Sequence, residues 1–261
     1  MRRESGILLP ITSLPSPYGI GCFSREAYEF IDYLKKAGQS YWQILPLGPT
    51  SYGDSPYQSF STFAGNPYFI SLEDLIEEGV LTREECAQAD PEVQEDSIDY
   101  AKLYEERYPL LRLAYERSDI SKNADFVRFC KENDWWLSDY ALFMAVKARF
   151  GGKAWTKWAQ DIRLRWGNAL DYYRRELYFD IEFHKYLQFT FFKQWSRLKA
   201  YANRQGIRII GDIPIYVAMD SADAWANPSL FQLDENNRPL AVAGCPPDGF
   251  SATGQLWGNP L

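Results

Sequence analysis

The chain has 261 residues, of which 46% are hydrophobic and 24% charged, a composition typical of a globular protein with a substantial core. Its formal charge of −7 is the balance of 28 basic and 35 acidic residues spread along the chain, which excludes nucleic acid as an expected partner. The apolar run near the amino terminus is interrupted by Pro10 and is too short for a signal sequence or a membrane span. The expectation is a cytoplasmic protein with no membrane partner.

The cysteine and histidine content argues against several kinds of site. A single histidine, His184, lies in a strongly helical stretch, where we expect it to pack or to face solvent. A histidine-rich metal centre or a serine–histidine triad is therefore not expected, and no cofactor is implied. The cysteines are far apart and form no C-x-x-C pair, which predicts free buried thiols without a zinc site; they are Cys22, Cys86, Cys130 and Cys245.

The first elements form a predicted β-α-β unit. Residues 6–11 are an apolar run that predicts a buried strand, and residues 41–47 predict a second one. Between them, Ser24 can cap a helix that Gly38 would end, with apolar residues recurring on one face. The two strands are therefore expected to be parallel neighbours.

The pattern recurs after a long helical region. A helix is predicted for residues 177–204 and a third parallel strand for 207–211, whereas 72–175 shows helical periods without a strong strand signal. We expect three regions: first strands and loops in 1–71, an inserted helical subdomain in 72–175, and continuing strands in 176–261.

Two parallel architectures fit these elements. A dinucleotide-binding fold would place G-x-G-x-x-G after the first strand, but the chain offers only Gly19 and Gly21 followed by Ser24. A (β/α)8 TIM-type barrel places polar, glycine-rich loops after its strands, as found here after residues 47 and 211. The barrel is the better fit, with only its first strands present.

Carboxylates and aromatic residues follow the predicted strands. Asp212 comes directly after the third strand and is either a ligand contact or a loop-ordering acceptor. Asp54 lies in a turn-forming sequence between Tyr52 and Tyr57, whose hydroxyls could bind a polyhydroxylated ligand. Aromatic residues make up 16% of the chain; most are expected in cores, although aromatic faces also suit sugar rings.

The final segment is interpreted as a long, functional loop. It contains Asp248, Gln255 and Trp257 among glycines and prolines, and Trp257 could either stack on a sugar or anchor the loop. Residue types alone identify no catalytic carboxylate pair. The residues by themselves indicate a barrel-type enzyme with an aromatic, carboxylate-bearing cleft for a neutral polar substrate.

Several motifs in chain order resemble those of the amylomaltase, or disproportionating-enzyme, family of 4-alpha-glucanotransferases. One departure is Pro10, where the family usually has histidine. The motifs are GILLPITSLPSPYGIG (6–21), QILPLGPTSYGDSPYQSFSTFAGNPY (43–68), WWLSDYALFMAVK (135–147), GIRIIGDIPIYVAMDSADAW (206–225) and PPDGFSATGQLWGNPL (246–261).

The resemblance implies a retaining double displacement that moves alpha-1,4-glucan segments between glucan chains, with maltooligosaccharides as substrates and glucose or glucan as acceptor. It implies that the family's three catalytic carboxylates lie beyond Leu261, so no catalytic residue is expected in this chain. Asp248 would belong to a loop that favours sugar acceptors over water. The implied donor-sugar contacts are Ser55, Tyr57, Asp212, Gln255 and Trp257.

Two alternatives stay open at this point. One is an alpha-glucan hydrolase of the same barrel type, and the other is a non-catalytic glucan-binding protein. Because about three of eight barrel strands are expected, we also expect the reading frame to continue beyond this sequence.

Overall fold

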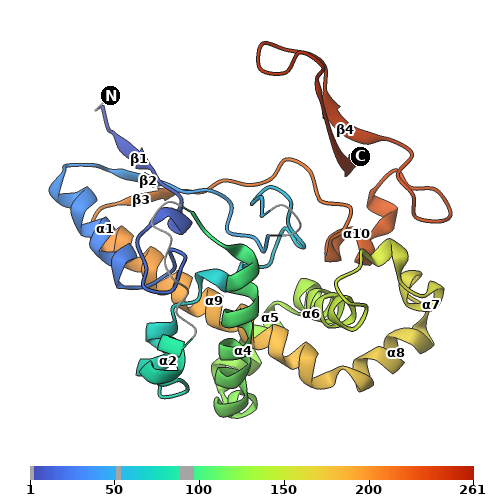
Figure 1. Cartoon of the computed structure of the whole chain (residues 1–261), viewed down its shortest axis with the longest axis horizontal. Coiled ribbons are helices and arrows are strands. Elements are labelled where there is room, and N and C mark those ends of the chain that lie inside the picture. Colours follow the sequence, from blue (N-terminus) through green and yellow to red (C-terminus); the bar gives the residue numbers. More distant parts are fainter. Residues whose placement is uncertain (1–2, 51–53, 89–96) are drawn as a thin grey trace. The chain divides into compact units, whose positions relative to one another are not determined.

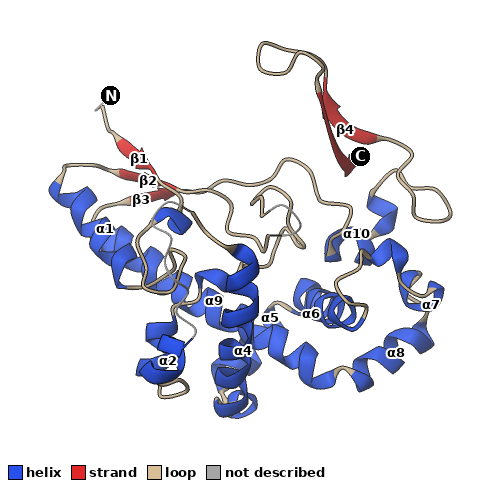
Figure 2. Cartoon of the chain, viewed as in Figure 1, coloured by secondary structure: helices blue, strands red, loops and turns tan. Residues whose placement is uncertain are grey.

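The computed structural model describes residues 3–50, 54–88 and 97–261 (Figures 1 and 2). The chain forms two compact units. Unit 1 comprises Met1–Leu47, Gly65–Lys131 and Tyr186–Ile213, and unit 2 comprises Gly48–Ala64, Glu132–Lys185 and Pro214–Leu261. These units mix segments from distant parts of the sequence, and the three regions expected from the sequence stay a prediction.

The described residues are predominantly helical, with a small parallel sheet in unit 1 and a hairpin in unit 2. The helices are α1 (Arg25–Lys36), α2 (Leu72–Glu77), α3 (Arg83–Gln88), α4 (Tyr100–Arg117), α5 (Ala124–Glu132), α6 (Asp134–Arg149), α7 (Gln160–Arg163), α8 (Gly167–Glu176), α9 (Tyr178–Arg204) and α10 (Ala222–Ala226), and the strands are β1 (Gly6–Leu8), β2 (Tyr41–Gln43), β3 (Arg208–Ile210), β4 (Val242–Cys245) and β5 (Gln255–Pro260).

The three strands of unit 1 form a parallel sheet in the order β1-β2-β3. Gly6 pairs with Tyr41, and Tyr41 pairs in turn with Arg208. The prediction of three parallel strands is confirmed, and the molecule is of the α/β class. Each strand is shorter than its apolar run, because the chain turns away from its neighbours soon after Leu8, Gln43 and Ile210.

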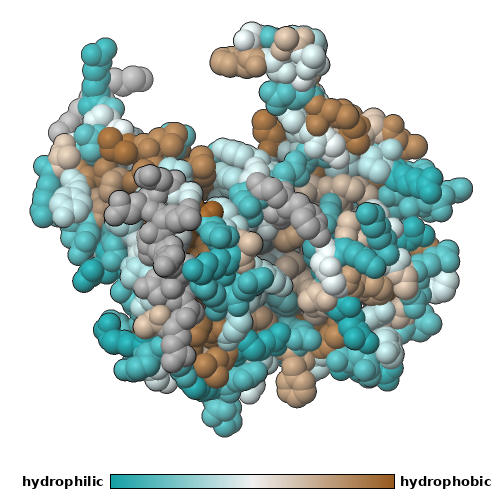
Figure 3. Space-filling view, viewed as in Figure 1, coloured by the Kyte–Doolittle hydropathy of each residue, from teal (hydrophilic) through white to brown (hydrophobic). Residues whose placement is uncertain are grey.

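The prediction that the first strand is buried was wrong. Ile7 is 42% exposed and Leu8 56%, whereas Trp42 on the central strand is fully buried. An apolar run predicts burial only if layers cover both sides of the strand, and β1 has a strand neighbour on one side alone among the described residues. Hydrophobic atoms gather on the surface at this part of unit 1 (Figure 3).

Helices α1 and the second half of α9 pack on one face of this sheet (Figure 1). Phe30 of α1 lies edge-on to Trp42, with ring centroids 5.1 Å apart. Tyr28 of α1 meets Tyr201 of α9 at 5.0 Å. Both helices occur where the apolar periodicity predicts them, and α9 begins one residue later than expected.

The start of α1 differs in detail from its prediction. Ser24 does occupy the N-cap position, but its side chain makes no capping hydrogen bond. Its hydroxyl donates instead to the carboxylate of Glu26. Gly38 ends the helix region with φ 70°, a left-handed conformation that suits glycine.

Two buried glutamines of α9 bind the backbone of Gly65 and Ser71, in the segment that follows the loop after β2. Gln188 accepts a hydrogen bond from the Gly65 N–H at 2.7 Å and donates to the Gly65 carbonyl at 2.9 Å. Gln194 accepts from the Ser71 N–H at 2.7 Å and donates to the Ser71 carbonyl at 3.3 Å. A side chain at residue 65 would collide with the Phe191 ring, which explains the glycine there.

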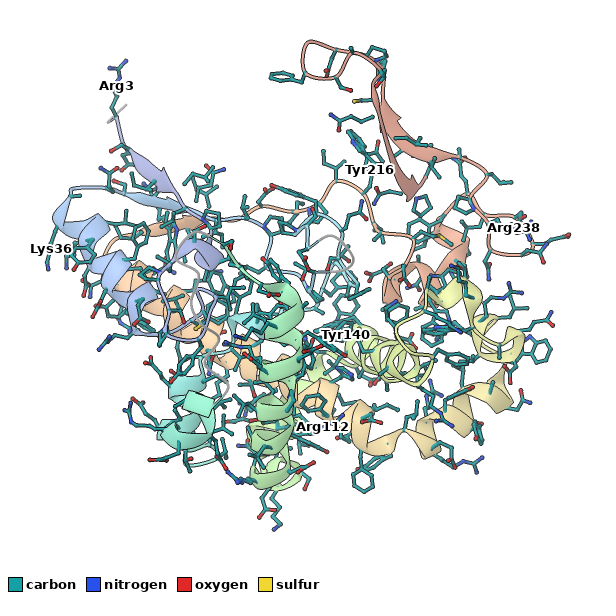
Figure 4. The ribbon with its side chains drawn as sticks, in the orientation of Figure 1. Arg3, Lys36, Arg112, Tyr140, Tyr216 and Arg238 are labelled. Atoms are coloured by element: carbon teal, nitrogen blue, oxygen red, sulfur yellow. The ribbon has the colours of Figure 1, made fainter. Side chains whose placement is uncertain are left out.

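The core of unit 2 is an aromatic cluster around α6. The ring centroid of Phe143 lies 5.3 Å from that of Trp158 and 6.0 Å from that of Trp225. The side chain of Trp155 is fully buried as well. Tyr140, labelled in Figure 4, is also buried on α6. Five of the nine tryptophans are buried, whereas other aromatic residues such as Trp135 and Phe179 are exposed, so the expectation that aromatic residues fill cores is met for only part of the set.

A buried ion pair crosses this cluster. Lys147 of α6 donates to Asp220 at 2.6 Å, and its ammonium lies 4.8 Å from the centre of the Phe60 ring. The other oxygen of Asp220 accepts from the Trp155 N–H at 3.2 Å. The lysine side chain is 6% exposed, so its charge depends on the aspartate for compensation.

We predict that Lys147→Met lowers the free energy of unfolding by about 3 kcal/mol, because it leaves Asp220 without its cation in a partly buried position. Adding Asp220→Asn should recover part of this loss, since asparagine still accepts from Trp155 and carries no charge. Chemical denaturation of the single and double variants measures both. Equal stability of the wild type and Lys147→Met would contradict the prediction.

The cysteines are free, as predicted, but only two are buried. Cys22 and Cys86 are buried, whereas Cys130 and Cys245 are partly accessible. The buried-thiol prediction was therefore wrong for the latter two. Burial raises the pKa of the Cys86 thiol to about 11, and the charge of Glu85 adds to this effect.

We predict that iodoacetamide at mildly alkaline pH modifies Cys130 and Cys245 well before Cys86, because both accessibility and thiolate formation are low at Cys86. Peptide mass spectrometry after timed quenching gives the order. In urea-denatured protein the difference should vanish, and early labelling of Cys86 in the native protein would refute the burial argument.

Candidate functional site

The segment holding Gln255 and Trp257 is a strand, not the irregular loop that its glycines and prolines suggested. β4 and β5 pair antiparallel, with Cys245 opposite Gln255, and only residues 246–254 form the connecting loop. The sequence pattern missed the hairpin because an irregularity in the ladder, with Gly258 at φ 79°, breaks the alternation of β5.

Gln255 and Trp257 lie on β5 in direct contact. The Trp257 indole N–H donates to the side-chain oxygen of Gln255 at 2.9 Å. The indole is 43% exposed, and Tyr216 lies beside it with ring centroids 6.0 Å apart (Figure 4). Together they present an aromatic surface with a carboxamide at its edge, a combination that can contact the apolar face and the hydroxyls of a sugar ring.

Asp248 orders the loop between β4 and β5. One of its carboxylate oxygens accepts from the N–H groups of Phe250 and Ser251, both at 2.8 Å. The Phe250 side chain is 98% exposed. The sequence analysis assigned no role to Phe250.

Ser55 and Tyr57 belong to a tight turn. The Gln58 N–H donates to the Ser55 carbonyl at 3.1 Å, and the Tyr57 N–H donates to the Ser55 hydroxyl oxygen at 3.3 Å. Asp54, just before the turn, has φ 55°, a left-handed conformation that aspartate tolerates better than most residues. The Tyr57 side chain is 44% exposed, and Tyr52 lies outside the described residues.

The turn and β5 are side by side within unit 2. The side chain of Gln58 donates to the side-chain oxygen of Asn259 at 3.2 Å. Asn259 donates in turn to the carbonyl of Val217 at 3.0 Å. The structure thus brings Ser55 and Tyr57 to the strand that carries Gln255 and Trp257.

A partly buried carboxylate holds the later part of the same loop. Asp223 of α10 accepts from the Thr62 N–H at 2.8 Å, and the Ala222 N–H donates to the Phe60 carbonyl at 2.8 Å. Burial raises the pKa of the Asp223 carboxyl, and the hydrogen bond from Thr62 opposes this effect. Asp223, Gln58 and Asn259 lie within the quoted motifs, but the sequence analysis assigned them no role, since their partners are distant in the sequence.

Asp212 belongs to unit 1 and lies two residues after the end of β3. One carboxylate oxygen accepts from the Ile213 N–H at 2.8 Å, so the loop-ordering interpretation is correct for this oxygen. Asp212 also borders a cavity of about 230 Å³ whose other lining residues are largely apolar: Ile44, Leu45, Leu47, Trp195, Lys199, Ile209 and Gly211.

Pro10, where the sequence departs from the family pattern, starts a short 3-10 helix at Ile11–Ser13. Its φ of −60° is the value that a proline ring imposes, and its carbonyl accepts from the Ser13 N–H at 3.0 Å. The residue therefore fits the first loop without strain.

Metal and membrane features were sought in residues 3–50, 54–88 and 97–261. No three acidic, cysteine or histidine side chains gather there in a way that could hold a metal ion. In the same residues, no helix has the length and apolarity needed to cross a membrane.

Comparison with known proteins shows close relatives. A 4-alpha-glucanotransferase of Clostridium butyricum is 52% identical over 252 residues, which cover 96% of this chain and 52% of the relative. A 4-alpha-glucanotransferase of Streptococcus pneumoniae is 51% identical over 262 residues, which cover 100% of this chain and 52% of the relative. The chain spans about half the length of the curated relatives that it matches.

A solved structure supports the same relationship. The amylomaltase from Streptococcus agalactiae, in complex with acarbose, superposes with a TM-score of 0.96 at 46% identity and covers 100% of this chain and 53% of that one. The family model described as 4-alpha-glucanotransferase matches residues 9–261. Because the match extends over nearly the whole chain, the protein belongs to the 4-alpha-glucanotransferase family.

Proposed function

We propose that this chain forms part of the sugar-binding cleft of an enzyme that transfers alpha-1,4-glucan segments between maltooligosaccharides or longer glucans. The observation that carries the proposal is the grouping in unit 2 of Trp257, Gln255 and the Ser55–Tyr57 turn, joined through Gln58 and Asn259. The relative from Streptococcus agalactiae was solved in complex with acarbose, which supports a carbohydrate ligand for the family.

Each group has a defined part in this proposal. The exposed face of Trp257 packs on the apolar face of a sugar ring, and the Gln255 amide and the hydroxyls of Ser55 and Tyr57 exchange hydrogen bonds with sugar hydroxyls. Asp212 accepts hydrogen bonds from sugar hydroxyls with the strength of a charged acceptor.

The loop between β4 and β5 contributes to the choice of acceptor. Asp248 holds its turn, and Phe250 is the exposed apolar residue that could exclude water from the cleft. Shielding from water would favour a sugar hydroxyl over hydrolysis in the second half of a retaining double displacement. No residue of this chain is assigned as nucleophile or acid/base.

The fold proposal is a (β/α)8 barrel that continues from the three parallel strands. The outer strands β1 and β3 support this proposal. Ile7, Leu8 and Ile210 on these strands are each more than a third exposed. Among the described residues the outer edges of β1 and β3 are also unpaired, as expected if further barrel strands pair there. We also propose that the protein acts in the cytoplasm.

We predict that the full gene product, incubated with maltotriose, produces glucose together with a ladder of longer maltooligosaccharides. Transfer conserves the number of glycosidic bonds, whereas hydrolysis produces only shorter chains. Anion-exchange chromatography of timed samples separates the two. Products no longer than maltotriose would favour a hydrolase, and binding without any product would favour a non-catalytic glucan-binding protein.

We predict that Asp212→Asn lowers kcat/KM for maltotriose by roughly ten- to a hundred-fold, because a charge-assisted hydrogen bond to a sugar contributes about 1.5–3 kcal/mol. The melting temperature should hardly change, since asparagine still accepts from Ile213.

Asp234→Asn is the matched control for this variant. Asp234 also accepts backbone hydrogen bonds, from Asn236 and Arg238, but in an exposed turn that the proposal does not use. Its kcat/KM should equal that of the wild type. A drop in melting temperature with normal kcat/KM in Asp212→Asn would make Asp212 a scaffold residue only.

A further inference from the structure

Three segments of unit 2 meet at one buried carboxamide. Asn259, near the end of β5, is 4% exposed. Its oxygen accepts from the Gln58 side chain at 3.2 Å, and its nitrogen donates to the Val217 carbonyl at 3.0 Å. Gln58 belongs to the loop that follows β2, and Val217 lies five residues after Asp212 in the segment that follows β3.

The partners determine the orientation of this amide. A carbonyl oxygen can only accept, so the NH2 group of Asn259 must face Val217. Its oxygen is then left for a donor, which the Gln58 amide supplies. Neither aspartate, which lacks the donor when ionised, nor leucine, which lacks both groups, can make the two bonds at once.

Gln58 links Asn259 to the turn that carries the residues expected to bind sugar. Its N–H closes the turn on the Ser55 carbonyl, so the side chain held by Asn259 and the backbone that holds Ser55 belong to one residue. Thr62 and Phe60 are held separately by α10, so the Asn259 contact acts on the turn itself.

We propose that Gln58 and Asn259 are positioning residues, which hold the Ser55–Gln58 turn against β5 in the arrangement that accepts the sugar. This inference rests on the proposed function for its ligand, but the contact itself is independent of it. If the contact is lost, the turn samples other arrangements, and the apparent affinity falls with the fraction of molecules that remain competent.

The test uses the full gene product and maltotriose as the probe. We expect Gln58→Met, which keeps the side-chain length and removes the donor, to raise the dissociation constant of maltotriose about three- to ten-fold. Stopped-flow tryptophan fluorescence, read within the first turnover, measures this constant before transfer changes the sugar. Hydrogen exchange at the amide of Gln58 should become faster by a similar factor. The melting temperature should change little, because Gln58 is only half-buried.

A double-mutant comparison shows whether the two residues act together. Asn259→Leu should weaken maltotriose binding as Gln58→Met does. The double variant should bind no more weakly than the weaker single variant, because both substitutions remove the same Gln58–Asn259 hydrogen bond. If Asn259→Leu does not fold, Asn259→Ala serves instead, since it also removes the oxygen that accepts from Gln58 and adds no bulk to the buried position.

Gln194→Met is the matched control. Gln194 is a carboxamide that also bonds to the backbone and is more deeply buried than Gln58, but it lies in unit 1 and holds Ser71. It should lower the melting temperature and leave both maltotriose affinity and exchange at Gln58 unchanged. This separates positioning of the turn from a general loss of stability.

The outcomes distinguish the proposals. Unchanged exchange and affinity in Gln58→Met overturn the positioning role, and weaker binding with unchanged exchange overturns it in favour of direct contact between Gln58 and the sugar. Faster exchange with unchanged affinity shows that the contact orders the turn without serving binding, which also overturns it. If the wild type itself does not bind maltotriose, the proposed function fails, and the positioning role for sugar falls with it, while the exchange data still report on the contact.

Discussion

Buried backbone groups in this protein are satisfied by carboxamide side chains at the points where loops meet regular structure. Gln188 and Gln194 of α9 each bind both the N–H and the carbonyl of one residue, Gly65 and Ser71 respectively. An amide is suited to this task, because it offers a donor and an acceptor side by side and carries no charge to desolvate. These two pairs of hydrogen bonds hold the backbone at Gly65 and Ser71, which belongs to no strand.

A related arrangement occurs in unit 2, where one carboxamide and one carboxylate hold the loop segments. Asn259 bridges Gln58 and Val217, and Asp223 takes the Thr62 N–H. Tyr57 on the loop and Trp257 on β5 are exposed, and both are proposed to contact a sugar. Exposed functional side chains therefore sit on backbone that is ordered by buried polar contacts, an arrangement typical of preorganised binding sites.

The charged groups of the core are compensated in a comparable way. Lys147 is neutralised by Asp220, which also holds the Trp155 N–H, and aromatic rings from Phe60 and Phe143 surround the ammonium. Buried aromatic residues contribute to the cores of both units, and other aromatic residues, including Trp257 and Phe250, are exposed. Composition alone cannot separate these two uses.

The sequence by itself determined the helices and the parallel strand order, because periodicity in α1 and α9 and the apolar runs around Trp42 and Ile209 are local signals. It also indicated the family, through motifs that residues 9–261 share with it. It did not reveal the exposure of β1, which depends on what covers a strand, or the β4–β5 hairpin, whose ladder is irregular at Gly258. Only the tertiary structure decided the roles of Gln58, Asn259 and Asp223, since their partners are distant in the sequence and a hydrogen bond between distant residues leaves no periodic or motif signal.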